Sequence, residues 1–453
     1  MNLTVLCLCY LILVFIMASD IIYILFKSKY ISSYLFCKII FIFVYAIIPF
    51  ILHFKFSIKG TLYPWDIYID YSMKGVDALY LSCFFSFIGY LFLTLGYIGN
   101  HRFTIQLYNK SSNVKKIYIY DEKKLRYTSI IISILGILAL FLWSSPFGGI
   151  RQLILQANSV RSGVSNVYNP YSFLKRFASL LLISSYAFFT LIIFKSKNKL
   201  IDLIFWTITS IFSIAYLLAS DGRMTTGFYF IGYVIIFLQS KSKLISKRIN
   251  FKDIIKVTLF FIMALLIMLK MDDLTYFIRN GVRYSYKSRI DESLIDKLVF
   301  ELSFVEKSSQ VAILDSEKIG LQIINDIGYG LYSWLPSSVF SSPFNRLWSL
   351  NTELAGWIRG ELPCGFITQG YYDLGLVGII IFPYIYGKLI KKIDSIDIKT
   401  LYGMTIYASI FYSIVRIVAY GMIYDVLQGV FSLFIFILIY FFIERLFEYK
   451  YKD

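Results

Sequence analysis

Long runs of hydrophobic residues, separated by shorter polar segments, cover most of the chain. A membrane-spanning helix needs roughly 20 consecutive apolar residues, and eleven runs reach or approach that length. They occupy residues 2–26, 31–54, 76–99, 127–144, 178–194, 200–219, 224–239, 254–271, 371–387, 400–420 and 426–443. This pattern predicts an all-α, polytopic integral membrane bundle of about eleven transmembrane helices, with residues 1–453 forming a single membrane domain.

The basic residues divide unevenly between the two sets of loops that such helices create. One set carries 24 Lys and Arg, whereas the other short segments carry 8. The basic set comprises residues 27–30, 100–126, 195–199, 240–253, 388–399 and the tail 444–453. Because loops rich in Lys and Arg stay in the cytoplasm, the chain is expected to have its N-terminus outside and its C-terminus inside.

Two polar segments on the predicted outer side are longer than the rest. Residues 145–177 form a medium extracytoplasmic loop, and residues 272–370 form a large one between the eighth and ninth helices. Within the large loop, apolar residues recur at helical spacing over 294–306 and leave Glu306 on the polar face, which predicts an amphipathic helix. The aromatic-rich stretch 329–357 is expected at the bilayer surface or over a cavity.

Composition supports the membrane class and narrows the chemistry. The chain is 58% hydrophobic, 19% aromatic and only 16% charged, which is too apolar for a soluble domain. Its formal charge of +17 does not indicate nucleic acid, because most basic residues flank apolar runs. The five cysteines show no disulfide or metal spacing, and with only His53 and His101 available, imidazole chemistry is not expected to be central.

Arginine is costly near hydrocarbon, so an arginine at a helix end or inside a span is a functional candidate. Arg223 follows Ser220-Asp221-Gly222 and opens the seventh helix, where free backbone N–H groups suit an anionic phosphate. The alternative is an interfacial arginine that snorkels to lipid headgroups. Arg416 stands four residues from the outer end of the tenth helix and is expected to face the interior. It is either a ligand-binding group or part of a structural ion pair with Asp425 or Asp373.

The outer loops supply further arginines. Arg151 and Arg161 lie in the medium loop, and neither spacing is diagnostic alone. Arg279 and Arg283 are i, i+4 neighbours that could clamp a diphosphate if that stretch is helical, although a solvated face is an equal alternative. Arg359 precedes a glycine by eleven residues, a spacing that chance also produces.

Carboxylates near the ninth helix and beside Arg223 are candidates for a general base, which a hydroxyl needs when it attacks an electrophile. They are Glu353, Glu361, Asp373 and Asp221. Lys38 and Asp20 fall in membrane runs near the cytoplasmic side, where snorkelling explains the lysine and a polar bundle contact explains the aspartate. No phosphate-binding loop, zinc motif or acidic metal cluster appears in the sequence.

Three stretches, taken in order, resemble bacterial polysaccharide repeat-unit polymerases, the Wzy-type O-antigen and capsule polymerases. The first is Tyr118–Leu125 entering the fourth helix, followed by Pro146-Phe147-Gly148-Gly149 and Asn158–Arg161. The second is Ser220–Arg223, and the third is the glycine-punctuated Gly370–Gly378. The histidine typical of the related ligases has no counterpart in the outer loops, which argues against that branch.

The resemblance implies a metal-independent glycosyltransferase, without a cofactor, in the bacterial cytoplasmic (inner) membrane. Its partners would be a polyprenyl-diphosphate-linked glycan donor, a lipid-linked acceptor, membrane lipids and a candidate chain-length regulator. Arginines would stabilise the diphosphate leaving group, a carboxylate would deprotonate the acceptor hydroxyl, and aromatics of 329–357 would stack on sugars. The alternative is a lipid-linked oligosaccharide flippase, although the chain lacks the two related halves common in transporters. A membrane acyltransferase is less favoured, because it would want a histidine at its site.

Overall fold

The computed structural model describes most of the chain, and every regular element in the described part is helical. The described residues are 3–27, 32–59, 69–99, 114–157, 160, 167–194, 198–220, 223–245, 259, 296, 299, 302–323, 325–335, 340, 342–356, 362–396, 400–421 and 423–450.

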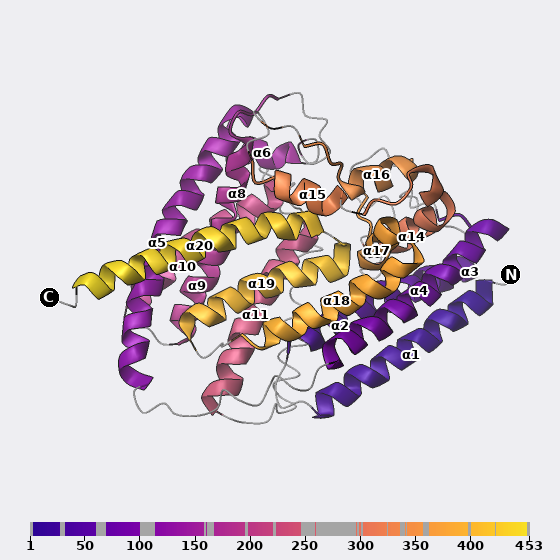
Figure 1. Cartoon of the computed structure of the whole chain (residues 1–453), viewed down its shortest axis with the longest axis horizontal. Coiled ribbons are helices and arrows are strands. Elements are labelled where there is room, and N and C mark those ends of the chain that lie inside the picture. The colour runs from indigo at the N-terminus through magenta and orange to yellow at the C-terminus, as the bar shows by residue number, and fades with distance from the viewer. Residues whose placement is uncertain are drawn as a thin grey trace.

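The described helices fall into two groups along the chain (Figure 1). The first half contributes α1 (Leu3–Lys27), α2 (Ser33–Ile42), the π-helical turn η1 (Phe43–Ile47), α3 (Ile48–Lys59), α4 (Met73–Ile98), α5 (Val114–Ser144), α6 (Ile150–Leu155), α8 (Lys175–Ala178), α9 (Leu180–Ile193), α10 (Lys199–Ser220) and α11 (Arg223–Ile245). The second half contributes α14 (Phe304–Asp315), the 3-10 turn η5 (Ser316–Lys318), α15 (Asn325–Tyr332), α16 (Leu347–Leu354), α17 (Phe366–Leu374), α18 (Leu376–Asp394), α19 (Leu401–Tyr420) and α20 (Ile423–Lys450).

Eight helical segments in the described part are long and apolar enough to cross a membrane. They are Leu3–Phe26, Ser33–Ile58, Met73–Ile98, Asp121–Phe147, Ser172–Ile193, Lys199–Ser220, Leu401–Tyr420 and Gly429–Phe447. Each of these helices coincides with one of the eleven apolar runs. An apolar segment that crosses lipid has to be helical, because only then are its backbone hydrogen bonds made within the segment. The chain is therefore a multi-pass, all-helical membrane protein, and the predicted fold class is confirmed.

Three of the predicted runs differ from this pattern. The seventh, 224–239, forms a shorter apolar helix at Thr225–Ser240, and the eighth, 254–271, lies outside the described residues apart from one position. The prediction of one helix over 371–387 is wrong. Gly375 has a φ of 62°, a left-handed conformation that favours glycine, so α17 ends before it and α18 begins after it.

The N-terminal helices enclose an ion pair. Lys38 of α2 is fully buried and pairs with Asp20 of α1, which also accepts a hydrogen bond of 2.7 Å from the Tyr90 hydroxyl of α4. The ammonium lies 4.6 Å from the ring centroids of both Tyr34 and Tyr90. The expectation that Lys38 snorkels to the interface is therefore wrong, because neighbouring helices supply its counterion.

Helices α4 and α18 pack closely, with backbone against backbone at two glycines. A Cβ atom added to Gly96 would overlap the carbonyl oxygen of Tyr384, and one added to Gly387 would overlap that of Leu93. Small residues at a helix crossing let two backbones approach in this way. This contact joins the N-terminal group of helices to the C-terminal group.

Four short helices, α14 to α17, are here called the cap, and they lie at the end of the bundle where α19 ends and α20 begins (Figure 1). In the cap, α14 packs on α4, α15 on α20, and α17 on α18. Glu306 of α14 is buried, so its predicted place on a polar face is wrong. It accepts hydrogen bonds from Tyr10 Oη at 2.7 Å and Ser82 Oγ at 3.2 Å, and it lies 3.2 Å from His53 Nε2. Hydrogen bonds from α1 and α4, with the histidine of α3, satisfy a carboxylate that the sequence pattern assigns to the polar side.

Candidate functional site

A cavity of about 290 Å³ lies among α8, α9, α18, α19 and α20, with Tyr216 of α10 in its wall. Arg176 and Arg416 line it, together with Lys175. Both arginines are near the cap end of the bundle, because α8 leads into the start of α9 and Arg416 stands four residues before the end of α19. The cavity is therefore cationic where it approaches the cap.

The rest of the cavity wall is mainly apolar. Its aliphatic residues include Leu182, Ile183, Leu389, Ile393, Ile410 and Leu433. Leu389 and Ile393 belong to the second half of α18, away from the cap helix α17 that precedes it. The lining also includes residues with hydroxyl groups, namely Tyr186, Tyr216, Tyr386, Tyr412, Ser179, Ser409, Ser413 and Ser432. This combination suits an amphiphilic ligand with an anionic head and a hydrocarbon tail.

Arg416 is buried with 5% of its surface exposed, which confirms that it faces the interior. Its guanidinium carbon lies 5.2 Å from the centroid of the Tyr412 ring, four residues earlier on α19. The helix that carries it begins at the Thr400 cap, which accepts from the Gly403 N–H, and ends at Gly421 in the left-handed conformation. Because both ends of α19 are defined by caps, the position of Arg416 along the helix axis is also defined.

Arg176 was not among the predicted arginines of the 145–177 loop. Its Nη1 donates a hydrogen bond of 3.2 Å to the Leu335 carbonyl, just beyond α15, and its own carbonyl accepts from Ser432 Oγ at 2.9 Å. Its position at the start of an apolar helix is the signal that singled out Arg223, and the same reasoning applied to residue 176 would have found it. Arg176 thus lines the cavity and also contacts the segment that follows α15 within the cap.

Asp326 of α15 is the buried anchor of the cap. Its carboxylate accepts from Leu347 N at 3.3 Å and Tyr424 N at 3.1 Å, which begin α16 and α20, and from Gln369 Nε2 at 3.0 Å. Burial raises the pKa of Asp326 to about 6, against the lowering effect of these hydrogen bonds and of Arg346. Nothing in the sequence pattern pointed to this residue, because its burial results from contacts between segments distant in the chain.

Asp373 of α17 is the predicted general-base candidate that the structure buries most deeply among those described. It is 2% exposed, and its Oδ1 has no hydrogen-bond partner among the described residues. Burial, followed by the negative charge of Asp326, raises the pKa of Asp373 to about 8. Asp373 is therefore coupled to Asp326 within the cap.

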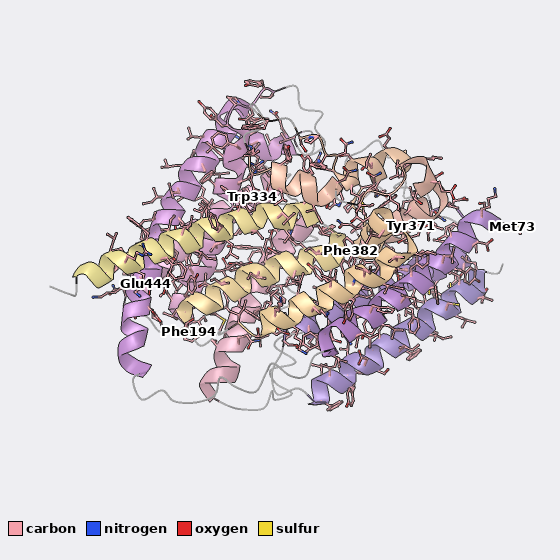
Figure 2. The ribbon with its side chains drawn as sticks, viewed as in Figure 1. Met73, Phe194, Trp334, Tyr371, Phe382 and Glu444 are labelled. Atoms are coloured by element: carbon pink, nitrogen blue, oxygen red, sulfur yellow. The ribbon has the colours of Figure 1, made fainter. Side chains whose placement is uncertain are left out.

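The cap and the cavity meet at the first turns of α20. Trp334 Nε1, just after α15, donates a hydrogen bond of 2.9 Å to the Leu427 carbonyl (Figure 2). Val426 and Gly429 of the same turns line the cavity, and Tyr424 N binds Asp326. Asp326 of the cap and the wall of the cavity are thus connected through one short segment of α20.

An aromatic cluster lies at the same end of the bundle. Tyr420 stacks on Phe304 with ring centroids 5.3 Å apart, and Trp348 lies 6.0 Å from Tyr420 and 5.9 Å from Tyr424. The predicted aromatic stretch contributes Trp348 and Trp334 to this region. These rings pack against one another and form one apolar cluster at the cap end of the bundle.

The remaining predicted site residues are spread more widely. Arg223 begins α11, as expected, and Phe228 further along that helix lies 6.1 Å from the Tyr420 ring, so the start of α11 is near the end of α19. The side chain of Arg223 lies outside the described part. Arg151 on α6 and Glu353 on α16 are exposed. Residues Arg161, Arg279, Arg283, Arg359 and Glu361 lie outside the described residues.

No family model, curated protein or solved structure matches this chain. Among the described residues, no group of three or more His, Cys, Asp or Glu side chains is arranged to hold a metal ion. The fold and the site define a multi-pass, all-helical membrane protein with an arginine-lined cavity beneath a small cap.

Proposed function

We propose that this protein is a membrane glycosyltransferase that polymerises polyprenyl-diphosphate-linked oligosaccharide repeat units into a surface polysaccharide, an O-antigen or a capsule. It works at the extracytoplasmic face of the bacterial cytoplasmic membrane, with its N-terminus outside and its C-terminus in the cytoplasm. The donor and the acceptor are both lipid-linked glycans, and a chain-length regulator is a candidate partner.

The observation that carries this proposal is the cavity shared by Arg176, Arg416 and long apolar walls. A polyprenyl diphosphate combines two phosphates with a hydrocarbon chain, so its two parts match the two kinds of surface. Guanidinium groups bind phosphate oxygens through paired N–H donors, and a site of low polarity strengthens that attraction. The apolar walls would hold the isoprenoid part nearest the phosphates.

The same arrangement supports bond breaking. As the bond between the sugar's anomeric carbon and the phosphate oxygen lengthens, negative charge grows on the diphosphate, and fixed cations stabilise that charge. The cap, with its buried carboxylates and aromatic rings, adjoins the arginine end of the cavity, so a sugar attached to the phosphates would extend toward it. Holding donor and acceptor together there would supply the orientation that the reaction needs.

The test is the surface-glycan ladder of cells that carry the intact gene, a deletion, Arg416→Ala, Arg176→Ala or Arg445→Ala at matched protein levels. Arg445 is an exposed arginine near the far end of α20, so it controls for the loss of one positive charge outside the cavity (Figure 2 labels its neighbour Glu444). A charged hydrogen-bond partner contributes about 1.5–3 kcal/mol, which corresponds to a roughly ten- to hundred-fold loss of polymer for each cavity variant.

The proposal predicts single repeat units capping the core in the deletion and shortened ladders in the two cavity variants, with a normal ladder for Arg445→Ala. Loss of all glycan, including the single unit, in the deletion would instead indicate a flippase. Full ladders in both cavity variants would remove the cavity from the reaction.

A further inference from the structure

Three polar atoms in the cap are buried without a hydrogen-bond partner among the described residues. They are the donor Trp348 Nε1 of α16 and the acceptors Gln369 Oε1 and Asp373 Oδ1 of α17. Buried polar atoms are ordinarily paired, so a group of orphans needs a cause. Two acceptors and one donor match the hydroxyl groups of a sugar.

Gln369 and Asp373 are one helical turn apart, so they lie on the same face of α17. The Nε2 of Gln369 donates a hydrogen bond of 3.0 Å to Asp326 Oδ2. This bond orients that face of α17 toward α15. The neighbouring Tyr372 hydroxyl donates to Asn351 Oδ1 at 2.8 Å and ties the helix to α16. These contacts fix α17 against α15 and α16, and they therefore position the helix face that carries both unpaired acceptors.

Negative charge near Asp373 comes from one neighbour. The charge of Asp326 on α15 raises the pKa of Asp373. The charge of Arg346 lowers the pKa of Asp326, and the charge of Asp315 on α14 raises the pKa of Tyr372, the residue before Asp373. The pKa of the Cys364 thiol, just before α17, is raised well above its ordinary value by burial and then by the charges of Asp326 and Asp373. The thiol therefore stays neutral.

The other elements packed on α17 present uncharged groups. Phe85 of α4 meets Tyr371, with ring centroids 5.6 Å apart. Phe382 of α18 faces Gly370, and Gly421 at the end of α19 faces Gln369 (Figure 2 labels Tyr371 and Phe382). Among the described residues, Asp326 is therefore the one anion that acts on the buried carboxyl of Asp373.

We infer that Asp373 is the catalytic group that removes the proton from the attacking hydroxyl of the acceptor glycan, and that Asp326 is a positioning residue beside it. The inference rests on the proposed function, because it assigns residues to the same reaction. Asp326 acts through Gln369, which it orients, and through its charge. Glu353, the other described candidate, is exposed on α16 and has no such partner arrangement.

The chemical step is balanced as follows. The acceptor hydroxyl gives its proton to Asp373 Oδ1 while its oxygen forms a bond to the anomeric carbon of the donor sugar. The bond from that carbon to the lipid diphosphate breaks, and its electron pair leaves with the phosphate. A carboxyl with a pKa of about 8 is a stronger base than an ordinary one, and it is best matched when that value lies near the working pH.

The experiment measures initial rates of polymerisation against pH for the purified full-length protein in detergent. Its substrate is the lipid-linked oligosaccharide that accumulates in cells lacking the gene. Wild type is expected to gain activity with rising pH, with an inflection near 8, because only the ionised carboxyl accepts a proton. Asp373→Asn is expected to lose roughly a hundred-fold of the wild-type activity above the inflection, and its remaining activity should no longer rise with pH, because the amide cannot accept the proton.

Asp326→Asn is expected to keep measurable activity and to move the inflection to lower pH, because it removes the negative charge that raises the pKa of Asp373. A merely structural Asp326 would lower the rate without moving the inflection. Glu317→Gln, an exposed carboxylate in η5, is the matched control and should leave the profile unchanged.

A wild-type profile in Asp373→Asn, or an unmoved inflection in Asp326→Asn, would overturn the inference. A hundred-fold loss in Glu353→Gln with none in Asp373→Asn would also overturn it. These outcomes still require wild type to make polymer, so the proposed function would survive them. Absence of polymer from folded wild-type protein would instead contradict the proposed function itself.

Discussion

Asp326 and Asp373 share one cluster, yet they hold their protons differently. Three hydrogen bonds favour the ionised form of Asp326 and limit its pKa to about 6. Asp373 has an unpartnered oxygen and a neighbouring anion, and its pKa reaches about 8. The pair therefore carries one charge around neutral pH, because Asp326 ionises first.

The titration of Asp373 predicts a pH-dependent stability. Its pKa rises from 3.8 to about 8 on folding, so the folded protein binds a proton that the unfolded chain has already lost between these values. Wild type should lose stability as pH rises through this range and level off above it. Asp373→Asn removes the effect, so its melting temperature in detergent should exceed that of wild type by a margin that grows from pH 5 to pH 8. A margin independent of pH would contradict the assignment.

Glu306 supports a second residue-level prediction, on folding. Glu306→Ala leaves the Tyr10 hydroxyl, Ser82 and His53 without their shared acceptor inside the bundle. Leaving a buried hydrogen-bonding group without its partner costs about 1–3 kcal/mol, so a clear drop in melting temperature is expected. Glu317→Ala, at an exposed carboxylate, should melt as wild type does. Equal melting of the two variants would mean that the buried network adds nothing.

Individual residues were predictable where one rule governed them. Arg416 interrupts an apolar run near a helix end, and that local pattern was enough to place it in the interior. Asp326 and Glu306 follow no local pattern, because partners from other helices determine their burial. Lys38 shows the same limit, since its counterion belongs to another helix.

At the scale of elements, the crossing of α4 and α18 supports a packing prediction. Gly387→Ala would place a Cβ against the backbone of Leu93 and force the helices apart, at a cost of about 1–3 kcal/mol. Gly429→Ala is the matched helical control, because its Cβ would meet Ser413 Oγ at an ordinary 3.6 Å. Thermal melting should show destabilisation for Gly387→Ala and none for Gly429→Ala. The reverse order would contradict the contact.

The apolar helices themselves were predictable because a span must supply both length and hydrophobicity within one continuous segment. The break at Gly375 was not, since hydropathy continues across it and only its positive φ separates α17 from α18. That break has a consequence for the site. It sets Asp373 in a short helix of the cap rather than in a membrane-crossing helix.

For the whole molecule, the membrane class follows from the sequence, but the position of the cap does not. Contacts of α15 with α20 and of α14 with α4 connect residues far apart in the chain, and no periodicity reports them. The proposed function assigns one role to the cavity and one to the cap. The arginines of the cavity would bind the lipid diphosphate, and the cap would bind the glycan.

The most direct test is reconstitution of the reaction with purified full-length protein and the lipid-linked oligosaccharide from cells lacking the gene, with no other protein present. The account predicts products of two or more repeat units on a denaturing gel. These products should be strongly reduced with Arg416→Ala and retained with Arg445→Ala. If folded wild-type protein leaves the single units unextended, and moves them across a vesicle bilayer instead, the protein is a transporter and the account is wrong.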